Sequence, residues 1–211
     1  IAFAAGTGNT GYFGLPVCLA LVGDEALPIV AMVSIGLILY ENTVGFYTVA
    51  RASHSAKIAL LKVLKLPSLY AFIGGILLNV FGVIPAVDVI NFFNILKGGY
   101  VPLGMMIIGL GLAEIKMHHL DWKFAAGALF NKFIIWPGIF LGLIYLDNSQ
   151  LHIFDKTVHS VLLIESMVPL AANAVSYATE LKVHPEKIAL VVTVSTLVAL
   201  FYIPAAVSIL L

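Results

Sequence analysis

Charged side chains are scarce in this chain of 211 residues, of which Asp, Glu, Lys and Arg make up 10%. An ordinary soluble domain contains about 25% charged residues and about 45–50% apolar residues, whereas 61% of this chain is apolar. The apolar residues recur in stretches of roughly 20, which is the length of helix that crosses a bilayer. The scarcity of charge therefore excludes a water-soluble fold and predicts an all-α integral membrane protein with several spans.

An excess of positive charge is also lacking, because 11 Lys and Arg residues balance 11 Asp and Glu residues. Without a basic block to follow a phosphate backbone, nucleic acid is excluded as a partner. The single cysteine, Cys18, excludes an intrachain disulfide. An initiator methionine and a basic signal-peptide region are missing at Ile1, so we interpret the chain as a fragment of a longer protein.

Catalytic motifs are lacking as well. No Ser/His/Asp or Cys/His arrangement has a supporting motif, and no glycine-rich loop is present that would cradle a phosphate. His118, His119 and Asp121 stand in one short loop, without the spacing that places metal ligands on one helical face. The sequence therefore predicts neither an enzyme nor a resident metal ion or cofactor.

Hydropathy predicts seven membrane spans. They lie at about 1–23, 27–50, 66–87, 98–114, 124–146, 157–179 and 188–211. Between the second and third spans, leucines and lysines alternate in the manner of a basic amphipathic helix on a membrane surface. We therefore divide the chain into residues 1–50, a connector at 51–65, and residues 66–211.

The distribution of Lys and Arg predicts the orientation of these spans, because cytoplasmic loops carry the cationic excess. Only Lys97 and Lys156 fall in loops on one side of the predicted membrane. Eight cationic residues fall on the other side: Arg51, Lys57, Lys62, Lys65, Lys116, Lys123, Lys182 and Lys187. The connector is therefore predicted to be cytoplasmic, and the carboxyl end after Leu211 is predicted to lie outside.

The first span contains small and polar residues at mid-depth, in the run Gly6-Thr7-Gly8-Asn9-Thr10-Gly11 that precedes Pro16. Proline lacks an N–H group, so Pro16 is expected to free the carbonyl of Tyr12 and to interrupt the helix. In lipid, freed backbone groups need partners from a cavity, an ion or a ligand. The alternative is a proline-kinked helix whose small residues serve close helix packing.

The sixth span contains the counterpart, Glu165-Ser166-Met167-Val168-Pro169-Leu170-Ala171-Ala172-Asn173. Because a carboxylate at membrane depth is costly unless it is paired, protonated or metal-bound, Glu165 is the leading candidate for an ion or proton ligand. The alternative is a structural ion pair between Glu165 and Lys132 in the fifth span. Glu41 in the second span is likewise a candidate for a proton relay or for pairing with Lys132.

Interrupted helices at corresponding positions are typical of transporters built from two inverted repeats. Repeats of five spans each would make the residues from 66 onward one repeat, so three spans would precede this chain. Helix amino termini that start near Pro16 and Pro169 would favour an anionic substrate, and freed carbonyls nearby would favour a cation.

The run Gly8-Asn9-Thr10-Gly11-Tyr12-Phe13-Gly14-Leu15-Pro16-Val17 resembles the signature of the auxin efflux carrier family of membrane transporters. The later run Met167–Ala174, followed by Val194-Ser195-Thr196-Leu197 and Pro204, is similar to the carboxyl-terminal end of that family. The resemblance implies a ten-helix fold of two inverted five-helix repeats, shared with bile acid sodium symporters, in which two broken helices cross. It also implies alternating-access transport of organic anions such as dicarboxylates or auxin-like acids.

Taken together, we expect a proton- or sodium-coupled carrier of a small organic anion, with a homodimer left open as its assembly. The expected substrate residues are Asn9, Thr10, Gly11, Pro16, Pro169 and Asn173. Glu165 and Tyr12 are expected to serve the coupling ion, with Lys132 and Glu41 as charge partners. Two alternatives stay open at this point: a seven-helix receptor or retinal protein with Lys132 as the Schiff-base lysine, and a transport-inactive membrane module with the carrier fold.

Overall fold

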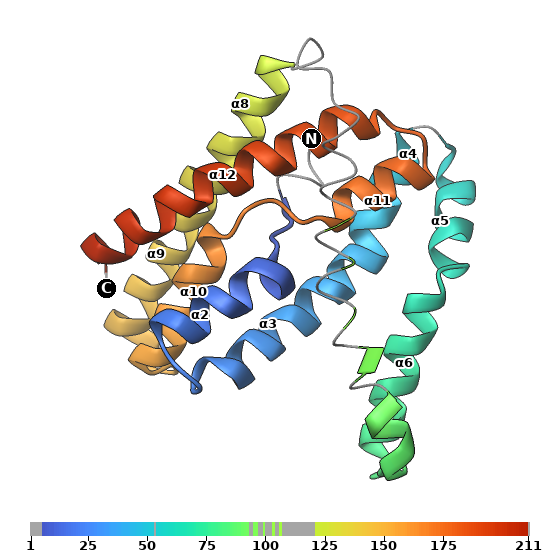
Figure 1. Ribbon diagram of the computed structural model, residues 1–211, viewed down its shortest axis with the longest axis horizontal. Helices are drawn as coiled ribbons and strands as arrows, with labels where there is room; N and C mark the ends of the chain where they lie inside the picture. Colours follow the sequence, from blue (N-terminus) through green and yellow to red (C-terminus); the bar gives the residue numbers. More distant parts are fainter. Residues whose placement is uncertain are drawn as a thin grey trace.

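The computed structural model describes residues 6–52, 54–92, 95–96, 99, 103, 106 and 121–210. This part of the chain is helical apart from turns and one isolated antiparallel bridge between Gly8 and Leu170. Its helices form a bundle in which α12 lies across the others, while α5 and α6 stand at one edge (Figure 1).

Three continuous helices are long and apolar enough to cross a membrane, namely Ala26–Arg51, Trp122–Leu151 and Pro185–Leu210. The first consists of α3 (Ala26–Tyr40), the widened π-helical turn η2 (Glu41–Gly45) and α4 (Phe46–Arg51). The second consists of α8 (Trp122–Phe130), η4 (Asn131–Ile135), α9 (Trp136–Leu146) and η5 (Asp147–Leu151). The third is α12 (Pro185–Leu210). They correspond to the spans predicted at 27–50, 124–146 and 188–211.

The other predicted spans are not single long helices. The first is a short helix, Thr10–Leu21, made of the π turn η1 (Thr10–Gly14) and α2 (Leu15–Leu21). The sixth is divided into α10 (Lys156–Met167) and α11 (Asn173–Glu180). The span predicted at 66–87 begins with α6 (Pro67–Val80), and the span predicted at 98–114 falls almost entirely outside the described residues.

The predicted connector contains the amphipathic helix α5 (Ala56–Leu64). Ser55 caps this helix by accepting a hydrogen bond from the N–H of Ile58, at 3.5 Å. Ala59 and Val63 are buried against Phe46, whereas Leu60 and Leu61 are exposed. Helices α5 and α6 meet at a bend of 51° and together are long enough for a span, so the described residues hold three single spans, or four with this bent pair.

Helix α10 lies at the centre of the bundle, and its apolar residues contribute to two buried clusters. One cluster joins Val161 and Ile164 to Cys18 of α2 and to Val30 of α3. The other joins Leu163 and Met167 to Phe133, Ala199 and Ile203. Because α10 packs on both sides, it places Glu165 in the protein interior, while large apolar side chains such as Met32 and Phe201 face outward, as expected of a surface in contact with lipid.

Candidate functional site

The sixth predicted span is interrupted where the sequence places Pro169. Helix α10 ends at Met167, and Val168 is extended with φ −61° and ψ 152°. A residue that precedes proline avoids the helical conformation, and Pro169 itself has no N–H to donate, so the helix ends here and resumes only at Asn173. The connecting residues are buried.

A second non-helical segment, Thr7–Asn9, precedes the helix Thr10–Leu21 and crosses the first interruption at contact distance; we call it the first interrupted segment, since it falls within the first predicted span. The N–H of Asn9 donates to the carbonyl oxygen of Pro169 at 2.8 Å, and Gly8 forms the antiparallel bridge with Leu170. A Cβ on Gly8 would lie 2.9 Å from Cγ2 of Val168 and 2.9 Å from Nζ of Lys132. Glycine is therefore the residue that lets the two interrupted segments meet.

The predicted helix break at Pro16 was wrong in position. Pro16 is the second residue of α2, within the continuous helix Thr10–Leu21, and the interruption lies seven to nine residues earlier, at Thr7–Asn9. The widened turn η1, in which Leu15 donates to the carbonyl of Thr10, directly precedes Pro16, and the helix continues through the proline to Leu21. The interruption instead lies where Gly8 and Asn9 contact the other segment.

At the crossing, two side chains accept hydrogen bonds from main-chain N–H groups. Ser195 of α12 accepts a hydrogen bond from the N–H of Leu170 at 3.1 Å. The side-chain oxygen of Asn9 accepts one from the N–H of Tyr12 at 3.2 Å, which caps the helix Thr10–Leu21. The N–H groups of Thr10 and Gly11, the first two of that helix, have no acceptor within it. They remain as donors at the crossing.

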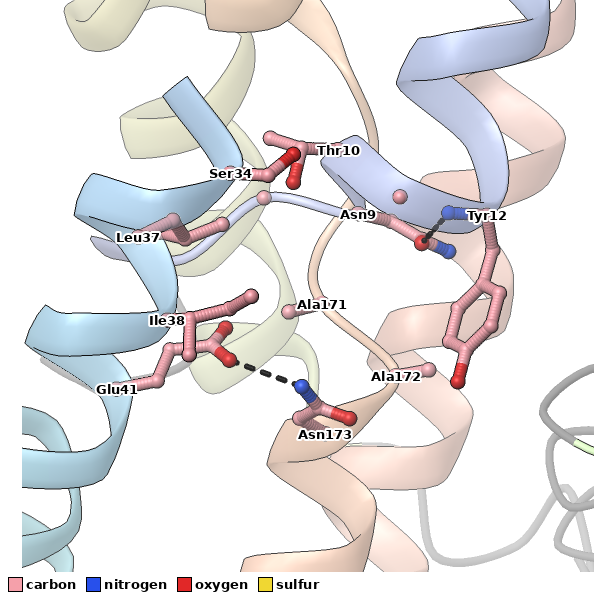
Figure 2. Close-up of a pocket in the computed structure, with 12 residues that line it drawn as sticks. Asn9, Thr10, Tyr12, Ser34, Leu37, Ile38, Glu41, Ala171, Ala172 and Asn173 are labelled. Atoms are coloured by element: carbon pink, nitrogen blue, oxygen red, sulfur yellow. Dashed lines mark hydrogen bonds between the residues drawn. The ribbon is translucent and has the colours of Figure 1, made fainter. Parts of the chain in front are cut away.

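A cavity of 140 Å³ lies on one side of the crossing, and we call it the Glu41 cavity (Figure 2). Glu41 is 2% exposed, and its Oε2 accepts a hydrogen bond from Nδ2 of Asn173 at 2.9 Å. Its Oε1 is buried and has no hydrogen-bond partner in the part of the chain that the structure describes. The cavity is lined by Gly8, Asn9, Thr10, Gly11, Tyr12, Ser34, Leu37, Ile38, Glu41, Ala171, Ala172 and Asn173.

A second cavity, of 100 Å³, lies on the other side, and we call it the Glu165 cavity. Glu165 is 5% exposed, and its Oε1 accepts a long hydrogen bond from Sγ of Cys18 at 3.6 Å, while its Oε2 has no hydrogen-bond partner among the described residues. Lys132, which is 4% exposed, lines the same cavity, with Nζ 6.0 Å from the ring centre of Trp136. Gly8, Thr10 and Leu37 line both cavities, so the first interrupted segment separates them.

Among the described residues no direct ion pair joins Lys132 to Glu165 or to Glu41, although Lys132 and Glu165 interact electrostatically in the cavity that they share. Within the described part of the chain, the ion pairs are His159 with Asp147 at 2.8 Å and Lys187 with Asp121 at 3.2 Å. Lys132 shares the Glu165 cavity without such a pair, because Glu165 packs on Gly14 and Cys18 of the opposite helix. Glu41 is instead hydrogen-bonded to Asn173, which lines the same cavity.

The structure brings most of the predicted site residues together. Asn9, Thr10, Gly11, Tyr12 and Asn173 line the Glu41 cavity, although Tyr12 was assigned to the coupling ion. Pro169 lies at the crossing itself, whereas Pro16 lines neither cavity.

The sequence did not predict two contacts, Cys18 with Glu165 and Ser195 with Leu170. It also did not predict that Ser34 lines the Glu41 cavity. A single cysteine or serine in an apolar helix carries no signal that would distinguish it from packing.

Among the loop residues weighed as metal ligands, His118 and His119 lie outside the described residues. Asp121 is described and caps α8, accepting a hydrogen bond from the N–H of Phe124 at 3.2 Å. This bond, with the ion pair to Lys187, lowers the pKa of Asp121. The described residues hold no group of three or more His, Cys, Asp or Glu side chains suited to a metal ion.

The chain matches the model of a protein family described as membrane transport protein, over residues 48–207. It is 29% identical over 201 residues to an uncharacterised transporter of Methanocaldococcus jannaschii, and the alignment covers 90% of this chain and 63% of that relative. It is 24% identical over 206 residues to an uncharacterised transporter of Methanothermobacter thermautotrophicus, covering 97% and 65% respectively. The chain thus spans slightly less than two thirds of the length of these curated relatives.

Proposed function

The chain belongs to the family of membrane transport proteins that includes the auxin efflux carriers, and from this premise we propose that it is part of a secondary active carrier of small organic anions. It is a multi-pass membrane protein of a transporter family, so the alternative of a retinal-binding receptor is not retained. The proposed substrates are carboxylates such as dicarboxylates or auxin-like acids, moved by alternating access.

The observation that carries this proposal is the contact between the break that separates α10 from α11 and the non-helical segment Thr7–Asn9, with a cavity on each side. Irregular backbone at membrane depth is tolerated only where it is buried in protein or lines a cavity. In carriers with broken helices, such positions hold the substrate and the coupling ion. Two cavities divided by one segment provide separate places for these two ligands.

We assign the substrate to the Glu41 cavity. The N–H groups of Thr10 and Gly11, at the amino terminus of the helix Thr10–Leu21, would bind a carboxylate group, which the helix dipole favours. Asn9 and Asn173 supply side-chain amides at the same cavity.

We assign the coupling ion to the Glu165 cavity. A buried carboxylate oxygen without a partner, Oε2 of Glu165, would bind a sodium ion or a proton. Thr10 and Ser166 also line this cavity and carry hydroxyl oxygens that suit a sodium ion. Because Thr10 lines both cavities, occupation of one would influence the other.

The architecture proposed for the whole carrier has ten helices in two inverted repeats of five. Residues 1–50 would end the first repeat, residues 51–65 would form the cytoplasmic connector, and residues 66–211 would form the second repeat. The two interrupted segments that cross at Gly8 and Leu170 would then be equivalent elements of the two repeats. Their antiparallel contact supports this arrangement.

The test is uptake of radiolabelled malonate, malate, aspartate and indole-3-acetate by the intact protein in proteoliposomes, with an imposed sodium or proton gradient. We expect one of these anions to accumulate in a gradient-dependent way. Glu165→Gln should abolish accumulation, whereas Glu180→Gln, the same change at an exposed position of α11, should leave it unchanged.

Equal accumulation and equal ion dependence in wild type and Glu165→Gln would remove Glu165 from the coupling role. If protein that is folded and inserted moves none of these anions, and does not exchange them, the transport-inactive alternative is favoured over the organic-anion carrier.

A further inference from the structure

We propose that the substrate of the Glu41 cavity carries a protonated amino group beside its carboxylate, and that Glu41 binds this ammonium group. The inference rests on the proposed function, since it specifies the chemical class of the transported anion. It assigns Glu41, which was expected to pair with Lys132, to substrate recognition.

Glu41 lacks a charge partner among the described residues. Its side chain is almost completely buried, Oε2 accepts a hydrogen bond from the amide of Asn173, and Oε1 has no donor among the described residues. A buried carboxylate group of this kind is costly unless donors or a cation complete its environment. Because Glu41 lines a cavity, a ligand in that cavity can supply the missing donor.

Among the described residues, no protein group near Glu41 takes that role. Glu41 is the only charged side chain among the described residues that line its cavity. The titratable groups facing it from neighbouring elements are phenols: Tyr12 of η1 lines the cavity, and Tyr177 of α11 donates to Asn42, the residue next to Glu41. Lys132, the only buried lysine or arginine among the described residues, lines the Glu165 cavity on the far side of the interrupted segment.

The Glu41 cavity has two ends of opposite electrostatic preference. Figure 2 shows Asn9 and Thr10 at one end and Glu41 with Asn173 at the other, with Ala171 between them. The end at Thr10 is the amino terminus of a helix and favours a carboxylate, whereas the carboxylate of Glu41 favours a cation. A ligand with both charges satisfies both ends, whereas a ligand with carboxylate groups alone would bring a second negative charge close to Glu41.

The test compares pairs of ligands that differ only in an amino group. Succinate is compared with aspartate, and propionate with alanine, by the thermal stabilisation of the purified intact protein and by uptake into proteoliposomes at pH 7. We expect the amino-substituted member of at least one pair to bind about ten- to a hundred-fold more tightly, the range for one hydrogen bond to a charged group.

Glu41→Gln removes the charge with little change of shape and should eliminate this preference. Glu25→Gln, the same substitution at the exposed amino-terminal cap of α3, is the matched control and should retain it. If Glu41→Gln does not fold, the wild-type comparison decides by itself.

Preference for succinate and propionate over their amino-substituted counterparts overturns the inference, as does equal binding within both pairs or no binding by aspartate and alanine. Binding of succinate with uptake of one proton, abolished in Glu41→Gln, also overturns it, because Glu41 would then hold a proton. Transport of the plain carboxylates alone would leave the proposed function standing. The absence of transport for every compound would count against the carrier function as well.

Discussion

At the scale of single residues, two glycines determine how closely the interrupted helices approach each other. Gly8 lies against Lys132 and Val168, and Gly14 lies against the carboxyl group of Glu165. A Cβ at Gly14 would come within 3.0 Å of Oε1, Oε2 and Cδ of Glu165. The position of the Glu165 carboxyl group therefore depends on the absence of a side chain at residue 14.

Gly14→Ala is expected to displace the Glu165 side chain, because the inserted methyl group occupies its place. Overpacking of this kind costs about 1–3 kcal/mol of stability. We expect a lower melting temperature in detergent and a loss of the ion dependence of uptake. Gly36→Ala in α3, where a Cβ meets nothing within 4 Å, is the control and should behave as wild type. Wild-type stability and coupling in Gly14→Ala would show that Glu165 has another position available.

At the scale of elements, the π turn η1 distinguishes the first interrupted helix from an ordinary proline kink. Asn9 accepts hydrogen bonds from the N–H groups of both Phe13 and Gly14 through its main-chain oxygen, at 3.1 and 2.9 Å. Pro16 follows two residues later and cannot restore the α-helical bond to the carbonyl of Tyr12. The proline thus acts on the geometry of the turn that carries Asn9 and Thr10.

Pro16→Ala is expected to impair transport while the amount of protein in the membrane stays close to normal. The alanine supplies an N–H group that can donate a hydrogen bond to the carbonyl of Tyr12. This α-helical bond would tighten the π turn η1 and shift Asn9 and Thr10 from their places at the cavities. Uptake should fall by about tenfold or more, equivalent to ~1.4 kcal/mol.

Pro67→Ala is the matched control, because Pro67 stands at the exposed first position of α6, away from both cavities. Uptake at wild-type rates in Pro16→Ala would mean that the widened turn is not required.

At the scale of the whole molecule, the position of the cationic residues predicts how the spans are oriented. Lys57 lies on the amphipathic helix α5, and Asp24 lies in the exposed turn between α2 and α3. The two positions are at opposite ends of the helix Ala26–Arg51, which is long enough to cross the bilayer. They should therefore be accessible from opposite sides.

Labelling of intact cells with a membrane-impermeant maleimide measures this orientation. Asp24→Cys should react from outside, whereas Lys57→Cys should react only after the cells are permeabilised. The native Cys18 is fully buried and provides a low background, which the unmodified protein controls. Reaction of Lys57→Cys in intact cells would reverse the proposed orientation.

The sequence by itself determined that the chain is a membrane protein of a transporter family, because apolar runs and the Gly8–Val17 motif are local features. It also located the interruption at Pro169, since the restriction that proline imposes acts on its immediate neighbours. Only the tertiary structure decided that the first interruption lies at Thr7–Asn9, and that Glu41 faces Asn173 rather than Lys132. Such contacts join residues more than a hundred positions apart, so they depend on how α3, α10 and α11 pack and not on any pattern within one span.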